Sequence, residues 1–135
     1  MNTRSGPRFI SVEVALAVHD RQLGEHGGLA GIKDIGLLES AMGRPLNKFG
    51  YGEPDLCALA AAYAFGVARE HPFTDGNKRT AWVMARLFLK LNRVEIAFDK
   101  ADAIRTMLAL AAGELAEDGL ADWFRTRVTE MPAGE

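Results

Sequence analysis

The 135 residues, of which 48% are hydrophobic and 25% charged, suit one globular domain over residues 1–135, with a core at about residues 10–128 and flexible termini. A formal net charge of −2 lacks the basic excess that a sequence-independent nucleic-acid binder needs, so direct nucleic-acid binding is not expected. The longest uncharged stretch, residues 56–68, is shorter than the ~20 residues that cross a bilayer, and no signal peptide is visible, which favours the cytoplasm and no membrane contact.

Two helices are predicted before residue 46. The first is capped by Ser11 and ends at the Gly27-Gly28 break, and its predicted inward face consists of Val14, Ala17, Val18 and the stem of Arg21. The second is capped by Asp34 and is predicted to end at Gly43-Arg44-Pro45, because proline cannot continue a helix. Its predicted apolar face consists of Leu37, Leu38, Ala41 and Met42.

Residues 46–53, Leu-Asn-Lys-Phe-Gly-Tyr-Gly-Glu, contain too much glycine for a helix and alternate too regularly for a featureless loop. This composition predicts a small hairpin or flap.

Two strongly apolar helices follow, and they flank a short polar loop. The first opens at Pro54-Asp55, is apolar nearly all round and ends before Pro72, as expected of a buried central helix. The second restarts near Gly76 and stops around Asn92.

The last part of the chain predicts one extended segment and two helices. Residues 94–98 alternate apolar and polar side chains, which favours a short strand. A helix capped by Asp99 is predicted to end at Gly113, and a last helix from about Glu117 carries Leu120, Trp123, Phe124 and Val128. The whole pattern predicts an all-α fold, a bundle of about six helices with one small flap or hairpin.

The polar loop, residues 71–80, reads His-Pro-Phe-Thr-Asp-Gly-Asn-Lys-Arg-Thr. A helix that begins at Gly76-Asn77-Lys78 presents unpaired backbone N–H groups and the positive end of its dipole, which together bind anions such as phosphate. Gly76 allows close approach of the backbone to a ligand, while Lys78 and Arg79 add positive charge.

Two further residues of this loop supply chemistry. Asp75 offers a hard oxygen ligand for Mg²⁺, which usually takes only one or two protein carboxylates beside phosphate. His71 belongs to the residue type that titrates nearest neutral pH and is suited to accept a proton from a hydroxyl nucleophile. The combination predicts a site for phosphoryl or nucleotidyl transfer.

Taken singly, each of these residues is more common in an ordinary connection between helices. Asp75 would then cap a helix, Lys78 and Arg79 would be solvated, and His71 would lie on the surface. Their concentration within the nine residues 71–79 favours a site over that alternative.

The other histidines carry no comparable signal. His19, Asp20 and His26 lack the local spacing of a metal site, so structural or solvated histidines are expected.

The motif His-Pro-Phe-x-Asp-Gly-Asn-Lys-Arg-Thr resembles the signature loop of the Fic/Doc superfamily, specifically its death-on-curing (Doc) branch of toxins. The likeness extends over roughly Ile10 to Trp123, through Gly27-Gly28, the segment Asp34-x-Gly36-Leu37-Leu38-Glu39 and Asn92. It implies a compact, all-helical Fic/Doc-type fold whose central helix is followed by the active-site loop and which carries a small flap nearby.

The resemblance also implies roles within the loop. His71 would be the general base that takes the proton from the target hydroxyl, and Asp75 would be the ligand of Mg²⁺. The positions that hold the phosphates of ATP, the implied co-substrate, would be Gly76, Asn77, Lys78 and Arg79.

Two positions bear on which group is transferred. Family members that transfer AMP have glycine where this chain has Lys78 and a second arginine where it has Trp82, whereas Doc-type members share the lysine and lack that arginine. The resemblance therefore implies a protein kinase that moves the γ-phosphate of ATP to a serine or threonine hydroxyl. The alternatives are a Fic-type AMP transferase and a catalytically idle partner-binding module or co-repressor.

Partners follow from the same resemblance. The family's target is a threonine of translation elongation factor Tu, whose modification blocks translation. Its toxins pair with a small Phd-like antitoxin that is partly disordered and folds on binding. The nearest match to the self-inhibitory motif of Fic relatives, Thr126 to Glu130, is followed by Met131 instead of glycine or asparagine, which favours an inhibitor in trans.

The family's flap docks the target chain by strand addition beside the active site. Candidates for substrate contact are therefore Lys48, Phe49, Gly50 and Tyr51, with a capped surface loop as the alternative.

Overall fold

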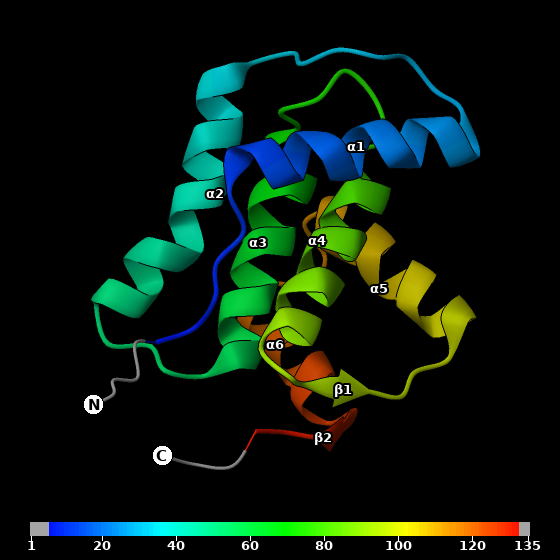
Figure 1. The fold of residues 1–135 in the computed structure, drawn as a ribbon. Coiled ribbons are helices and arrows are strands. Elements are labelled where there is room, and N and C mark those ends of the chain that lie inside the picture. The colour runs from blue at the N-terminus through cyan, green and yellow to red at the C-terminus, as the bar shows by residue number, and fades with distance from the viewer. Residues whose placement is uncertain (1–5, 133–135) are drawn as a thin grey trace.

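The computed structural model describes residues 6–132, so the termini that were predicted to be flexible, residues 1–5 and 133–135, lie outside the described residues. Figure 1 shows a mainly helical fold with one small sheet. In chain order the elements are α1 (Val12–His26), α2 (Ile35–Gly50), α3 (Leu56–Glu70), α4 (Asn77–Leu91), β1 (Glu95–Ile96), α5 (Lys100–Ala111), α6 (Glu117–Arg125) and β2 (Val128–Glu130). The predicted all-α class and the number of helices are confirmed.

Helix α3 is the centre of the fold, as its uniformly apolar sequence predicts. Eleven of its 15 residues are buried, and α2, α4, α5 and α6 all pack against it (Figure 1). Its small side chains allow close contact: a Cβ added to Gly66 would lie 3.0 Å from the Cβ of Ala41 in α2. No helix among residues 6–132 combines the length and the apolar character that a membrane span requires.

Four helices begin at side-chain caps, three of them at the caps that the sequence predicts and α3 at Asp55, which was predicted to open that helix. In each case the capping side chain accepts a hydrogen bond from a backbone N–H of the first turn, which would otherwise be unpaired. These caps are Ser11, Asp34, Asp55 and Asp99.

The predicted end of α2 at Gly43-Arg44-Pro45 is wrong, because the helix continues to Gly50 with Pro45 buried inside it. A proline within a helix removes one hydrogen bond and costs about 3 kcal/mol. Packing of α2 along α3 outweighs that cost. The predicted hairpin at residues 46–53 is wrong for the same reason, since residues 46–50 form the last turn of this helix.

The predicted inward face of α1 is wrong for Val14, Ala17 and Arg21, whereas Val18 is partly buried and packs against the core as predicted. The buried residues are Ala15, His19 and Gln22, whereas Val14 is 40% exposed and the Arg21 side chain is 79% exposed. The face that packs on the protein therefore carries two polar side chains, which a count of apolar residues cannot identify.

The extended segment predicted at residues 94–98 is confirmed as β1, which pairs antiparallel with β2. Val128 belongs to β2 and pairs with Ile96, so its placement in the last helix was wrong.

Candidate active site

The loop between α3 and α4 is anchored to an extended segment that precedes α2. Phe73 in the loop is fully buried and forms an isolated antiparallel bridge with Ile32. Main-chain hydrogen bonds of 2.8 and 3.1 Å flank the bridge and join Lys33 to Pro72 and Thr74 to Gly31. The loop is therefore fixed along its length rather than held only at its ends.

Asn77, the first residue of α4, closes this loop from inside. Its side chain is buried; Oδ1 accepts a hydrogen bond from Phe73 N at 3.0 Å, and Nδ2 donates to Phe73 O at 2.9 Å. The amide that was predicted to hold phosphate is thus engaged with the backbone of its own loop. What Asn77 offers to a ligand is its backbone N–H at the start of the helix.

The carboxylate of Asp75 is oriented by two backbone N–H groups. Leu29 N donates to Oδ2 at 3.1 Å and Gly76 N donates to Oδ1 at 2.8 Å. These bonds, that from Leu29 foremost, hold the pKa of Asp75 below its ordinary value of 3.8, so the group is ionised at neutral pH. Gly28 leaves the space required, because a Cβ there would lie 2.9 Å from Oδ2.

A histidine for which the sequence predicted only a structural or solvated role holds the other side of Asp75. His19 in α1 is only 3% exposed, and its Nε2 lies 2.8 Å from the backbone oxygen of Asp75. Its ring stacks on Phe73 with a centroid distance of 3.7 Å and an interplanar angle of 6°. The expectation of a structural histidine is confirmed, but its place beside the loop was not foreseen.

The start of α4 is an uncapped helix end. Gly76 occupies the N-cap position in the left-handed conformation, with φ 77°, and supplies no capping side chain. Among residues 6–132, the backbone N–H groups of Asn77, Lys78 and Arg79 have no hydrogen-bond acceptor. The exposed side chains of Lys78 and Arg79 add positive charge, so this end of the helix can bind an anion.

A cavity of about 650 Å³ opens at this point, between α1, α4 and α5. Five of the six loop residues predicted to act, Asp75 to Arg79, line it. The rest of the lining is mostly apolar and includes Trp82, Phe98, Ala103, Ile104, Met107 and Leu108. The cavity therefore has a polar end at the start of α4 and an apolar surface on which a flat ring can pack.

His71 stands apart from these five residues. It forms the C-cap of α3 in the left-handed conformation, with φ 54° and ψ 58°, and its side chain is exposed. It does not line the cavity, although it belongs to the same short loop as Asp75. A substrate group must therefore bridge the cavity and the histidine for both to act on it.

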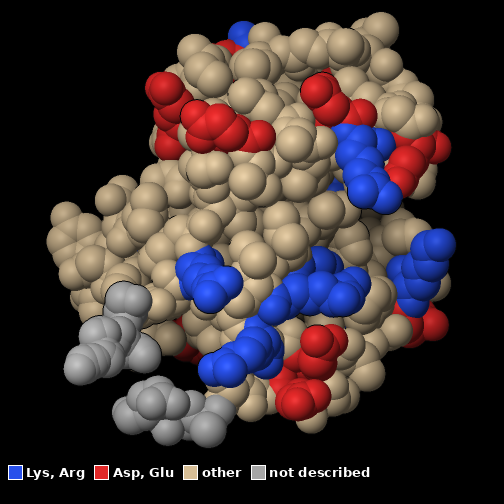
Figure 2. All heavy atoms as spheres, in the orientation of Figure 1, with Lys and Arg blue, Asp and Glu red and all other residues tan. Residues whose placement is uncertain are grey.

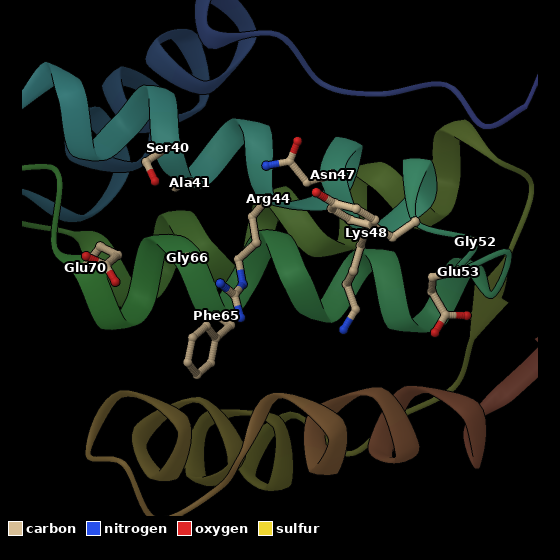
Figure 3. Close-up of a pocket in the computed structure, with 11 residues that line it drawn as sticks. Ser40, Ala41, Arg44, Asn47, Lys48, Gly52, Glu53, Phe65, Gly66 and Glu70 are labelled. Carbon is tan, nitrogen blue, oxygen red and sulfur yellow. The ribbon is translucent and has the colours of Figure 1, made fainter.

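The residues proposed as a docking flap lie elsewhere. Asp34, at the start of α2, donates its N–H to Pro72 O, and Lys48 follows about 20 Å further along the helix at 1.5 Å per residue. Lys48 lines a separate cavity of about 590 Å³ beside α3 (Figure 3), and its Nζ lies 3.0 Å from Oε2 of Glu117 in α6. The premise of a flap beside the loop is wrong, because α2 carries these residues away from it.

The segment beside the loop is instead residues 31–33. Ile32 is 42% exposed, and among residues 6–132 its own N–H and C=O have no backbone partner, since the bonds to the loop come from the residues on either side. The signal in the sequence was the glycine-rich stretch 27–31, which prevents a helix there.

Charge on the visible face is mixed. In Figure 2, Lys and Arg gather mainly over the half occupied by α4, α5 and β1, whereas most Asp and Glu lie over the half that contains α1. Among the described residues, no group of three or more His, Cys, Asp or Glu side chains could hold a metal ion unaided. Any cation held by Asp75 would need further oxygen ligands from a substrate or from water.

Comparison with known proteins bears on this loop directly. A model of the Fic/DOC family matches residues 9–89, which contain α1 to α3, the whole of the loop and all but the last two residues of α4. The chain is 39% identical over 119 residues to "Protein kinase doc" of Escherichia phage P1, covering 87% of this chain and 94% of that protein. It is 45% identical over 76 residues to "Toxin Doc" of Mycolicibacterium smegmatis, covering 54% of this chain and 58% of that protein.

Proposed function

The chain belongs to the Fic/DOC family, and from this premise we propose that it is a Doc-like toxin that transfers the γ-phosphate of ATP to a serine or threonine hydroxyl of a translation factor. The main support is the start of α4, where unpaired backbone N–H groups and two cationic side chains meet the Asp75 carboxylate at one end of a cavity. The names of the two relatives, a kinase and a toxin, support the same function.

The phosphates of ATP bind at the start of α4. The N–H groups of Asn77, Lys78 and Arg79 donate to phosphate oxygens, and the two side chains offset the negative charge in different ways. The Lys78 ammonium is a mobile point charge, while the Arg79 guanidinium is a planar fork. The apolar wall that includes Trp82 and Phe98 offers a surface for the base.

Asp75 fits a role as the protein ligand of Mg²⁺. Its carboxylate is ionised and exposed, and among residues 6–132 each oxygen accepts only one hydrogen bond, which leaves a lone pair on each. Bound Mg²⁺ would neutralise charge on the phosphates during transfer. The bonds from Leu29 and Gly76 keep the carboxylate in one orientation, so little ordering remains to be done when the nucleotide binds.

His71 is the general base. As the target oxygen bonds to the γ-phosphorus, the bond from that phosphorus to the bridging oxygen breaks and ADP leaves, while the hydroxyl proton passes to the His71 imidazole. The exposure of His71 outside the cavity suits this role, because the base must be reached by a hydroxyl that belongs to another protein.

The target chain docks on residues 31–33. The free N–H and C=O of Ile32 can pair with an extended segment, which would lie on the opposite side of the strand from the active-site loop. Such pairing would place the target chain two strand spacings, roughly 10 Å, from the Phe73 segment, so a target side chain must cross the 31–33 strand to reach His71.

Lys78 and Trp82 favour transfer of phosphate over transfer of AMP. Lys78 fills the position at which a small residue would leave room for a nucleotide's inner phosphates. Trp82 packs against the rings of Phe98, Trp123 and Phe124 and lines the cavity with apolar surface where a second phosphate-binding arginine would be required.

The test is incubation with elongation factor Tu, the target that the family resemblance implies, in ATP labelled at either the α or the γ position. We expect label on the target only from the γ position. Label from the α position would support an AMP transferase instead.

The proposed function also includes toxicity to the cell and inhibition of that toxicity by a partner protein. We propose that a small Phd-like antitoxin inhibits the protein in the cytoplasm, where elongation factor Tu acts. Expression without the antitoxin should stop growth, and His71→Ala should abolish that effect while the protein stays folded. Growth arrest by His71→Ala at the level of the wild type would favour the idle, partner-binding alternative.

A further inference from the structure

His19 contacts the loop through a hydrogen bond and through ring stacking, and it does not line the candidate nucleotide cavity. Its Nε2 lies 2.8 Å from Asp75 O, and its ring stacks flat on Phe73 at 3.7 Å. A backbone carbonyl can only accept a hydrogen bond, so Nε2 carries the proton and donates it. The ring is 3% exposed, which means that no solvent-facing role explains it.

The hydrogen bond fixes one particular peptide unit. The carbonyl of Asp75 and the N–H of Gly76 belong to the same planar peptide group. His19 holds the carbonyl end, and the Asp75 carboxylate accepts the N–H end at 2.8 Å. A peptide held at both ends cannot rotate, so the carboxylate that caps it and the helix that follows it are oriented together.

The helix start also rests on the histidine ring. A Cβ added to Gly76 would lie 3.8 Å from Nε2 of His19, so the backbone of Gly76 passes directly beside the imidazole. Gly76 is in the left-handed conformation and provides no side chain to cap α4. The direction of the first free N–H groups of α4 is therefore set from outside the helix, by a residue in α1.

We propose that His19 is a positioning residue: by binding the Asp75–Gly76 peptide it holds the Asp75 carboxylate and the first N–H groups of α4 in the arrangement that binds Mg²⁺ and phosphate. This inference rests on the proposed function for its catalytic consequence. Its structural part, the orientation of the loop by His19, is testable without ATP.

Three variants separate the hydrogen bond from the packing. His19→Phe keeps a ring that can stack on Phe73 and removes the donor, whereas His19→Gln keeps an N–H donor at similar reach and removes the ring. Tyr63→Phe is the matched control, because it removes another buried bond from a helix side chain to a distant backbone, that between Tyr63 and Ile10 at 2.8 Å.

The first readout is amide NMR of the protein without nucleotide. In His19→Phe, the N–H resonances of Gly76, Asn77 and Lys78 should shift, and hydrogen exchange of the Gly76 N–H, which is bonded to the Asp75 carboxylate, should accelerate. In His19→Gln, exchange of the Gly76 N–H should stay close to that of the wild type. Tyr63→Phe should leave these resonances unchanged even if its melting temperature falls as far. Unchanged loop resonances in His19→Phe would overturn the proposal.

The second readout is the kinetics of γ-phosphate transfer. His19→Phe should lower kcat on the order of 10- to 100-fold, as loss of outer contacts to metal ligands does elsewhere. It should also raise the Mg²⁺ concentration needed for half-maximal rate and leave KM for the target protein unchanged, and His19→Gln should recover most of the loss. A His19→Gln enzyme as impaired as His19→Phe would contradict the role of the donor. Absence of transfer by the wild type would overturn the proposed function and leave the NMR result to decide on His19.

Discussion

Asn77 holds Phe73 by both of its backbone groups, accepting from its N–H at 3.0 Å and donating to its C=O at 2.9 Å. The first residue of α4 therefore determines the shape of the loop that precedes it. The same arrangement recurs at the other end of α4, where Asn92 accepts from Arg8 N at 2.8 Å and donates to Arg8 O at 3.0 Å. The Asn77–Phe73 pair fixes the loop of the candidate active site, and the Asn92–Arg8 pair fixes the segment before α1 to the end of α4.

This pair of asparagines gives a matched test of the loop. Asn77→Ala should lower the free energy of unfolding by about 1–3 kcal/mol, because it leaves the buried N–H and C=O of Phe73 unpaired. It should also lower kcat/KM for phosphate transfer. Asn92→Ala should cost less stability, since Asn92 is only half-buried, and should leave transfer unchanged. Denaturant unfolding measures the stability of the two variants, and steady-state kinetics measures their kcat/KM. Full activity in Asn77→Ala would contradict the role of Asn77 in shaping the active-site loop.

Alanine substitutions at Gly28 and Gly27 distinguish the effect of backbone strain from the effect of contact with Asp75. Both have positive φ, 124° and 78°, so alanine at either position should cost about 1–3 kcal/mol of stability. Only the Cβ of Gly28→Ala meets the Asp75 carboxylate, at 2.9 Å, whereas Gly27→Ala meets open space. We therefore expect Gly28→Ala to raise the Mg²⁺ requirement and Gly27→Ala not to do so. Equal Mg²⁺ dependence in the two variants would show that Gly28 matters only for its backbone.

The starts of α1, α2, α3 and α5 could be predicted from sequence because a cap is local. Ser11, Asp34, Asp55 and Asp99 each bind an N–H two or three residues ahead, so the short stretch that contains them contains the whole interaction. The position of the loop between two apolar helices was predictable for the same reason. The family signature within the loop then identified the candidate site.

What could not be predicted depends on contacts between distant segments. The passage of α2 through Pro45 relies on packing against α3, and the place of Lys48 follows from that helix rather than from its own neighbours. His19 forms a stripe with Ala15 and Gln22 at helical spacing, but two of these three are polar, so apolar periodicity pointed to Val14 and Val18 instead.

The low pKa of Asp75 makes a prediction about acid stability. The two backbone N–H bonds stabilise the ionised form in the folded protein, so the folded pKa is below the ordinary 3.8. Their contribution is therefore complete above pH 3.8 and is lost as the pH falls through the folded pKa. Asp75→Asn lacks this contribution. The difference in free energy of unfolding between wild type and Asp75→Asn should therefore shrink as the pH falls from 3.8 through the folded pKa of Asp75. A difference that grows on acidification would contradict the assignment, and unfolding curves at several pH values measure it.

We expect Lys48 to contribute to the stability of the fold and not to binding of the target protein. Its ammonium is paired with the nearly buried Glu117 carboxylate, which also binds Arg44. Lys48→Met should lower the free energy of unfolding by about 1 kcal/mol or less, because the lysine side chain remains 30% exposed and Arg44 still pairs with Glu117. KM for elongation factor Tu should not change. A large rise in that KM would restore this end of α2 as a docking surface.

The mass of elongation factor Tu after incubation with the protein, ATP and Mg²⁺ tests the central claim most directly. Intact-protein mass spectrometry should show the gain of a single phosphate group with the wild type and no change with a folded His71→Ala variant. Gain of AMP by the target, or an equal gain of phosphate with His71→Ala, would contradict the assignment of His71 and the start of α4 as a phosphoryl-transfer site.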